Sequence, residues 1–84
     1  MLKSKSVLKR VRQTRKRYLA NRAKKNRLRT MIRRLISTET KKDAEALLPS
    51  VQSAIDRLVQ DKIIHKNTAS RYKRKLYHHL ASLP

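Results

Sequence analysis

The fold of this chain is decided by residues 28–36, LRTMIRRLI, whose apolar residues recur at the spacing of one helical face. They follow the i, i+3, i+4, i+7 rule of an amphipathic helix and are Leu28, Met31, Ile32, Leu35 and Ile36. Upstream, Arg15, Arg22 and Lys25 interrupt the same track, although no residue there breaks a helix. We therefore expect one helix from about residue 6, roughly 45 Å long at 1.5 Å per residue. Only the C-terminal third of this helix can bury an apolar stripe, so the rest of the helix should project beyond any bundle.

Two further amphipathic tracks follow. The apolar face of the second helix is expected at Ala44, Leu47, Leu48, Val51, Ile55, Leu58 and Val59, and that of the third at Ala69, Tyr72, Leu76, Leu80 and Leu83. Thr40, followed three residues later by Asp43, resembles a capping box, so the second helix should start near Lys41. Pro49 removes one backbone hydrogen bond, which predicts a kinked helix or, alternatively, a helix that starts at Pro49. Asn67 is the expected N-cap of the third helix.

Composition points to an all-α fold. Gly is absent and Pro occurs only at positions 49 and 84, so the residues that make tight turns and phosphate-cradling loops are missing. A chain of 84 residues forms one domain at most. We predict an up-down-up three-helix bundle with a long N-terminal helix that projects beyond it. Within the single domain 1–84, residues 1–27 are the basic helical extension and residues 28–84 the bundle core.

The charge is segregated along the chain. Residues 1–36 hold fifteen Lys or Arg and no acid, residues 37–61 have a net charge of −2, and residues 62–84 add six basic residues and no acid, within a total of +19. Such a density of like charge disfavours a compact free state, so a polyanion is the expected partner. We also expect residues 1 to about 25 to be largely disordered in the free protein and to become helical when the polyanion binds.

Catalytic and metal chemistry lack the necessary residues. The chain has no Cys, all five acids lie between Glu39 and Asp61, and no Gly frames a nucleophile turn, so we predict no catalytic residue and no enzyme activity. His78 and His79 are adjacent and point about 100° apart on a helix, so they cannot chelate as an i, i+4 pair could. We expect neither a metal site nor a cofactor.

Two stretches carry specific motifs. The first runs Lys9-Arg10-x-Arg12-Gln13-x-x-Lys16-Arg17, then Asn21, then Arg29-Thr30-x-Ile32-Arg33-Arg34; the second runs Ile64-His65-Lys66-Asn67-x-Ala69-x-Arg71-x-Lys73-x-x-Leu76. Over nearly its whole length the chain thus resembles the family of bacterial-type small-ribosomal-subunit protein twenty. The resemblance implies a structural constituent of the small ribosomal subunit, a ribonucleoprotein component in translation. It implies direct binding to the 5′ domain of the ribosomal RNA and to the foot of its long penultimate helix.

The resemblance also implies RNA-facing roles for the matched polar residues. They are Lys9, Arg10, Arg12, Gln13, Lys16, Arg17, Asn21, Arg29, Thr30, Arg33, Arg34, His65, Lys66, Asn67, Arg71 and Lys73. From the charge pattern we add Arg22, Lys24, Lys25 and Arg74. One departure concerns Lys62, which stands where the family commonly has Gly and so argues against a left-handed cap at the end of the second helix. Pro49 and the Tyr77-His78-His79 cluster also depart from the family, and no function is assigned to them.

Several readings compete. The leading one is an RNA-binding protein that neutralises and pins packed ribosomal RNA helices on a cytoplasmic bacterial ribosome or an organellar ribosome. We expect few protein–protein contacts, no homo-oligomer and no membrane association. The alternative is a sequence-tolerant DNA-binding or chromatin-type helical protein, although the charge peaks along an N-terminal rod and not on a recognition helix. An organellar transit peptide would also be Arg-rich and free of acids. A membrane-active peptide is disfavoured because no helix has a bulky apolar face with Trp or Phe.

Overall fold

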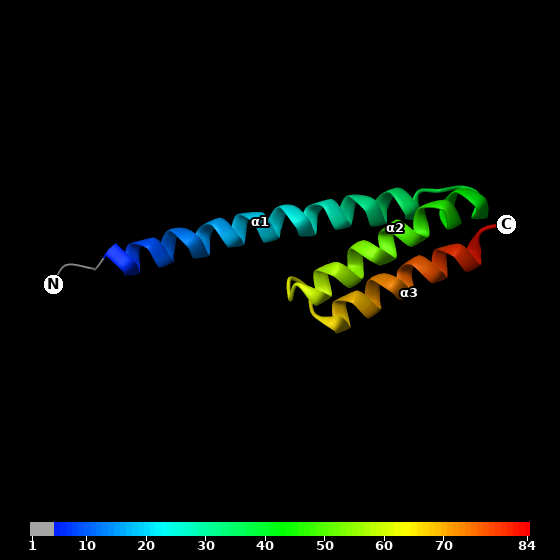
Figure 1. The fold of residues 1–84 in the computed structure, drawn as a ribbon. Helices are drawn as coiled ribbons and strands as arrows, with labels where there is room; N and C mark the ends of the chain where they lie inside the picture. The colour runs from blue at the N-terminus through cyan, green and yellow to red at the C-terminus, as the bar shows by residue number, and fades with distance from the viewer. Residues whose placement is uncertain (1–4) are drawn as a thin grey trace.

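The computed structural model describes residues 5–84, and in this range the chain is helical apart from the two connections and the last two residues. The helices are α1 (Lys5–Ile36), α2 (Lys41–Gln60) and α3 (Lys66–Ser82). The predicted all-α fold with a long first helix is therefore confirmed (Figure 1). The predicted extension begins at residue 1, and its first four residues lie outside the described range.

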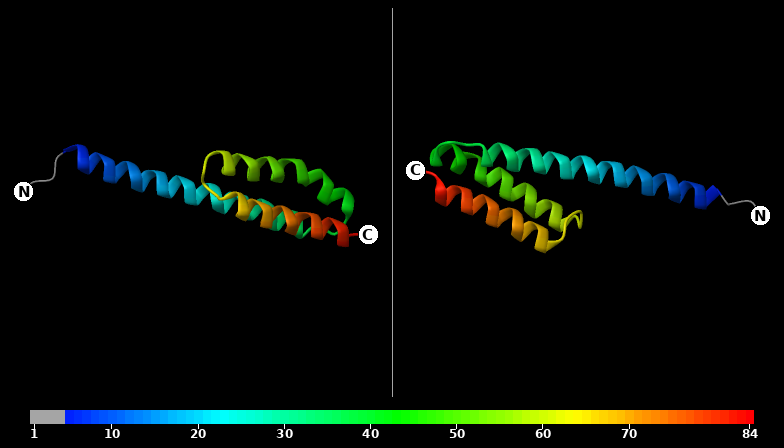
Figure 2. Two further views of the ribbon diagram at one scale, coloured as in Figure 1. Left: turned by 90° about the horizontal axis from the view of Figure 1, so that it is seen from below. Right: turned by 180° about the vertical axis from the view of Figure 1, so that it is seen from behind.

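The molecule is a rod with a small bundle at one end. It measures 67 × 19 × 15 Å along its principal axes. α2 runs back along the C-terminal part of α1, and α3 reverses direction again, so that the N-terminal part of α1 extends alone beyond the other two helices (Figures 1 and 2). This arrangement follows from the sequence because the apolar stripe of α1 is confined to its last third.

The core takes its buried residues from all three helices. They are Leu28, Ile32 and Leu35 from α1, Ala44, Val51, Ile55 and Leu58 from α2, and Ala69, Leu76 and Leu80 from α3. Each was expected from the apolar spacing of its helix, and the other predicted positions pack around this core as partly buried residues. No polar or charged residue is buried among residues 5–84, so the bundle is held mainly by apolar packing.

The connection between α1 and α2 is stabilised by side-chain hydrogen bonds. The Thr40 hydroxyl accepts from the backbone N–H of Asp43 at 3.2 Å, which confirms the predicted cap and the start of α2 at Lys41. The Thr38 hydroxyl donates to the Leu35 carbonyl at 2.6 Å. His79 Nε2 lies 3.2 Å from that hydroxyl oxygen and 3.1 Å from the Thr38 carbonyl, so it is the donor here. The end of α3 is thereby tied to the connection.

α2 continues through Pro49. The helix is unbroken from Lys41 to Gln60 with Pro49 inside it, and its axis visibly bends in the left panel of Figure 2. The kinked-helix prediction is supported and the alternative start at Pro49 is wrong. The reason is that apolar residues on both sides of the proline, Leu48 and Val51, pack on the same core, and this outweighs one missing backbone hydrogen bond.

The end of α2 corrects the expectation for Lys62. Lys62 has φ of 59°, which is the left-handed conformation that was not expected of a lysine at this place. Its N–H donates to the Val59 carbonyl at 3.0 Å, and the Ile63 N–H donates to the Leu58 carbonyl at 2.9 Å. These two bonds form a Schellman motif. They require φ > 0 at this residue whether or not it is Gly.

The start of α3 corrects the predicted N-cap. His65, and not Asn67, is the N-cap, and its Nδ1 accepts from the Asn67 N–H at 3.1 Å. Asn67 lies in the first turn of α3 because the helix begins one residue earlier, at Lys66. Since Nδ1 is an acceptor, His65 carries its proton on Nε2, where it remains able to donate.

Candidate nucleic-acid interface

The candidate interface is the surface of α1, which carries fourteen Lys or Arg and no acid between Lys5 and Ile36. No residue before Leu28 is buried in the described part of the chain, and the side chains of this projecting part are exposed except for the half-buried Asn21 and Lys25. None of the Lys and Arg side chains of α1 forms an ion pair with a carboxylate of the described chain. Their charge therefore acts outward, toward a ligand.

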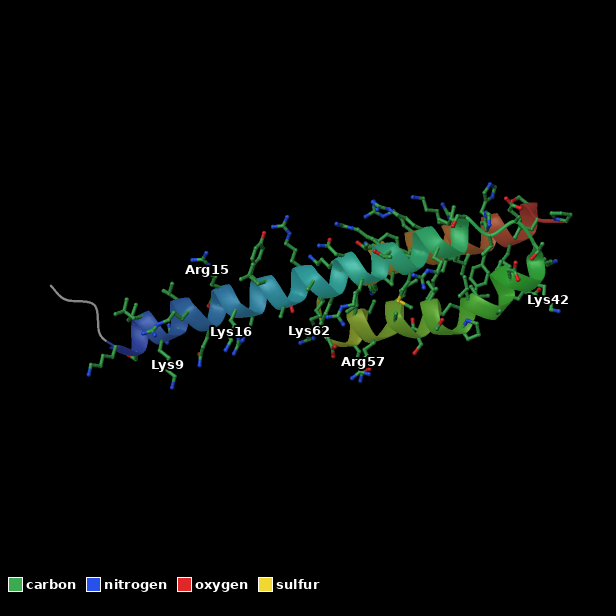
Figure 3. All side chains as sticks on the ribbon, turned by 90° about the horizontal axis from the view of Figure 1, so that it is seen from above. Lys9, Arg15, Lys16, Lys42, Arg57 and Lys62 are labelled. Carbon is green, nitrogen blue, oxygen red and sulfur yellow. The ribbon has the colours of Figure 1, made fainter. Side chains whose placement is uncertain are left out.

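Eleven of the fourteen cations of α1 form three rows along the helix, as a turn of about 100° per residue requires. The first row is Lys5, Lys9, Arg12 and Lys16; the second is Arg10, Arg17 and Lys24; the third is Arg15, Arg22, Arg29 and Arg33. The rows are separated by roughly 100–140° around the axis. In Figure 3, Arg15 projects on one side of α1 while Lys9 and Lys16 project on the other.

The three rows allow contact with anionic groups from several directions at once. Arg offers a planar fork for two phosphate oxygens, and Lys acts as a mobile point charge. A straight duplex touches mainly one side of a rod, whereas folded RNA with neighbouring helices can surround it. The arrangement of charge on α1 therefore suits a folded polyanion better than a single straight duplex.

The predicted residues of the second stretch lie at the opposite end of the bundle from the α1–α2 connection. His65, Lys66 and Asn67 start α3, and all three are exposed. The connection between α2 and α3 lies level with the middle of α1 in Figures 1 and 2. The structure thus places this group at the level where the bundle meets the projecting part of α1. Arg71 and Arg74, further along α3, are also exposed.

Besides His65, whose Nδ1 caps α3, two of the predicted residues make side-chain contacts within the protein. Lys73 Nζ lies 2.7 Å from Asp56 Oδ1, which forms the only ion pair among residues 5–84. Its charge is partly neutralised before any ligand arrives, so it is a weaker candidate than Arg71 or Arg74. The Thr30 hydroxyl donates to the Asn26 carbonyl at 3.0 Å, so toward a ligand it can act only as an acceptor in this rotamer.

Several exposed cations were missing from the predicted set, Lys5 of the first row among them. Arg15 and Arg27 are exposed on α1, and Arg57 is exposed near the end of α2. Arg15 belongs to the third row, and the seven-residue repeat that it forms with Arg22 and Arg29 could have identified it. Arg57 could not be found in this way because it lies in the acidic segment of the sequence. In Figure 3 it projects on the same side as Lys9, Lys16 and Lys62.

Aromatic residues offer one exposed stacking candidate. Tyr18 is 62% exposed on the projecting part of α1, close in sequence to Arg15, Arg17 and Arg22. Tyr72 is half-buried against the core, as expected, and Tyr77 accepts a hydrogen bond from Gln52. Tyr18 is therefore the tyrosine best placed to pack against a base or a sugar.

A metal site or a membrane-spanning helix would each be recognisable in residues 5–84. No group of three or more His, Asp or Glu side chains is placed to hold a metal ion. None of the helices in this range combines the length and apolar character that crossing a membrane requires.

The sequence matches a protein-family model and several curated proteins. The model described as ribosomal protein S20 matches residues 3–81. Among similar proteins, the small ribosomal subunit protein bS20 of Parabacteroides distasonis is 42% identical over 83 residues, covering 99% of both chains. The protein of the same name from Flavobacterium johnsoniae is 43% identical and covers 99% of this chain and 100% of its own. That of Salinibacter ruber is 42% identical with 99% of both chains covered.

Proposed function

The chain belongs to the ribosomal protein S20 family, and from this premise we propose that it binds small-subunit ribosomal RNA directly through α1 and stabilises the packing of the RNA helices. Membership confirms the resemblance noted in the sequence. It makes the chain a structural constituent of the small ribosomal subunit and not an enzyme. Its bacterial relatives indicate a ribosome of the cytoplasm, the first of the two predicted locations.

The observation that carries the proposal is the acid-free surface of α1. Fourteen cations lie along one helix, eleven of them in the three rows, and no carboxylate of the described chain is paired with any of them. Packed RNA helices repel one another through their phosphates, so a cationic rod between them lowers the free energy of the packed state. The chain acts in this proposal by binding alone, and the bundle serves to hold α1 in place.

The proposed RNA surface extends to the start of α3. His65 Nε2, Lys66 and the side chain of Asn67 are free to reach a phosphate or a 2′-hydroxyl, since the cap uses only His65 Nδ1 and the Asn67 backbone. We assign the RNA partner to the 5′ domain and the foot of the long penultimate helix, as the family resemblance implies. Few contacts with other proteins are expected, because the like charges along α1 favour a polyanionic partner.

Replacing Arg29, Arg33 and Arg34 together by Ala tests the proposal. We expect the affinity for small-subunit ribosomal RNA to fall and its salt dependence to become shallower by about 2 to 3 in slope, since each phosphate contact contributes about 0.7 to 0.9. Binding is measured by filter retention over a salt series. The control replaces Lys41, Lys42 and Lys75, which removes equal charge from exposed positions outside the proposed surface. Equal losses for both triple variants would contradict the proposal.

A competition experiment between RNA and duplex DNA distinguishes the proposed function from the DNA-binding alternative. Labelled small-subunit ribosomal RNA is bound at fixed salt and challenged with unlabelled duplex DNA or with the same RNA. We expect the RNA to compete at least tenfold more effectively by mass, because folded RNA can contact several rows of α1 at once. Equal or better competition by duplex DNA would favour the alternative.

A further inference from the structure

A groove lies between α1 and α2 at the end of the bundle where the two helices separate. Its volume is about 330 Å³. Its floor includes Leu28 and Met31 of α1 and Ala54 of α2, and its rim carries Lys24, Arg27 and Arg57. A space of this size is at the lower limit of small-ligand pockets, so it is too large for a single ion and too small for a protein helix.

The chemistry of the groove combines a flat apolar floor with a cationic rim. Leu28 is buried, and Met31 and Ala54 are half-buried around it. The thioether of Met31 makes favourable contacts with aromatic rings. None of the three rim cations is engaged in an ion pair, since the pair in the described chain joins Lys73 and Asp56. An occupant with an aromatic ring and an attached negative charge could place the ring on the apolar floor and the charge against the cationic rim.

The groove also has one acceptor and a position that continues the cationic surface. Asp61 lies at its edge, and a carboxylate there can accept from the amino group of a nucleobase. Lys24 is the last member of the second row, after Arg10 and Arg17. A strand whose phosphates follow this row along α1 would reach the groove directly. Charge and position thus both favour a segment of the same RNA over a free small molecule.

We propose that the groove holds one unstacked nucleotide of the ribosomal RNA, with its base on Met31 and Ala54 and its phosphate on the cationic rim. The proposal rests on the proposed function and adds to it a site outside the residues that the sequence motifs indicate, with Arg27 and Arg57 as phosphate ligands. Single-stranded bases in loops and bulges are available for such binding, whereas paired bases are not. The groove therefore recognises an unpaired position in the folded RNA.

Filling the groove tests the proposal. Ala54→Leu extends an apolar side chain into it and leaves every charge in place, and Ala46→Leu makes the same change at an exposed position of α2 outside the groove. Wild type and both variants are bound to full-length small-subunit ribosomal RNA, and nucleotide accessibility is mapped by chemical probing at saturating protein. We expect one or a few unpaired nucleotides to be protected by wild type and by Ala46→Leu, and to become reactive again with Ala54→Leu.

Affinity provides the second readout. We expect Ala54→Leu to bind about tenfold more weakly, which corresponds to 1.4 kcal/mol, with an unchanged salt slope. That value lies within the range measured for stacking of one base on a protein. Should Ala54→Leu lose helicity, the double variant Arg27→Gln and Arg57→Gln leaves the floor intact and should expose the same nucleotides. Identical protection in wild type and in a folded groove variant would overturn this proposal alone, whereas absence of any binding by wild type would overturn the proposed function as well.

Discussion

Lys62 shows how one residue can carry a conformation to which its side chain is poorly suited. A non-Gly residue in the left-handed region costs roughly 1–2 kcal/mol, because its Cβ approaches the following carbonyl oxygen. The two Schellman hydrogen bonds satisfy carbonyls at the end of α2. They also direct Ile63 and Ile64 back against the core, where both are partly buried. The bonds and the packing together outweigh the strain.

Lys62→Gly should therefore stabilise the protein. The relief of strain is partly offset by the greater entropy of Gly in the unfolded chain, so we expect a gain of up to about 1 kcal/mol in the free energy of unfolding, measured by urea denaturation. Lys62→Ala is the control, because it removes the same charge and keeps the Cβ. An equal gain for Lys62→Ala would show that charge repulsion, and not backbone strain, is the cause.

The Leu35 side chain tests how much a single core residue contributes to stability. Its side chain is 0% exposed, so Leu35→Ala should lower the free energy of unfolding by about 2–5 kcal/mol, through lost apolar burial and the cavity left behind. Leu19 is 54% exposed on the projecting part of α1, and Leu19→Ala should change stability by less than about 0.5 kcal/mol. Thermal unfolding of both variants compares them directly. Similar losses would mean that the projecting part packs against something in the free protein.

At the scale of the element, α1 is one helix with two environments. Its last third packs against α2 and α3, while the part before Leu28 has no buried residue and many like charges. Isolated helical segments gain little stability in water, and like charges three or four residues apart reduce it further. The helicity of the projecting part must therefore depend strongly on external counter-charge.

We expect the projecting part of α1 to exchange its amide hydrogens fast in the free protein and slowly in the RNA complex. Residues 28–36 should be protected in both states, because their helix is held by the core. Hydrogen exchange with fragment-level resolution measures the two segments in one experiment, and circular dichroism follows the total helix content. A free protein that is as helical and as protected as the complex would contradict this expectation.

α2 offers a second test at this scale. Pro49 lacks the N–H that would bond to the Glu45 carbonyl, and a proline in a helix interior costs about 3 kcal/mol. Pro49 is exposed, so Pro49→Ala restores the donor without filling the core. We expect a gain of about 1–3 kcal/mol in the free energy of unfolding, measured with urea. A loss of stability would show that the bend itself is needed for packing between the helices.

At the scale of the whole molecule, the projecting part of α1 and the bundle differ in net charge. The five acids lie between Glu39 and Asp61, so the bundle dilutes its own positive charge while the projecting part of α1 does not. Binding to RNA should then be governed by the release of counterions from phosphates. The bundle holds α1 in place, and the projecting part of α1 contributes most of the electrostatic free energy of binding.

The salt dependence of RNA binding measures how much of the binding free energy comes from the cations of α1. If half of the α1 cations each engage one phosphate, the logarithm of the association constant should fall against the logarithm of salt concentration with a slope of about −5 to −6. Filter binding to small-subunit ribosomal RNA across a salt series gives this slope. A slope shallower than about −2 would mean that the cationic rows make few phosphate contacts, and that the proposed role of α1 is wrong.

Most of the helical architecture could be predicted because it depends on local spacing. The apolar repeat around Leu28 and Leu35 defines which third of α1 is buried, and Thr40 with Asp43 defines where α2 begins. The acid-free composition of α1 likewise identifies it as the candidate interface, and the family motifs narrow the residues further. The individual RNA contacts, and the division into an extension of residues 1–27 and a core of residues 28–84, stay predictions.

The three helices, their buried faces and the segregation of charge thus follow from the amino-acid order, since periodicity and charge are properties of neighbouring residues. Which residues meet across the chain depends on how the helices pack. This packing paired Lys73 with Asp56, tied His79 to Thr38, and brought Lys24 and Arg57 to one groove. It also placed Lys62 in the left-handed region, because the packing of Ile63 and Ile64 imposes a conformation that lysine does not favour on its own.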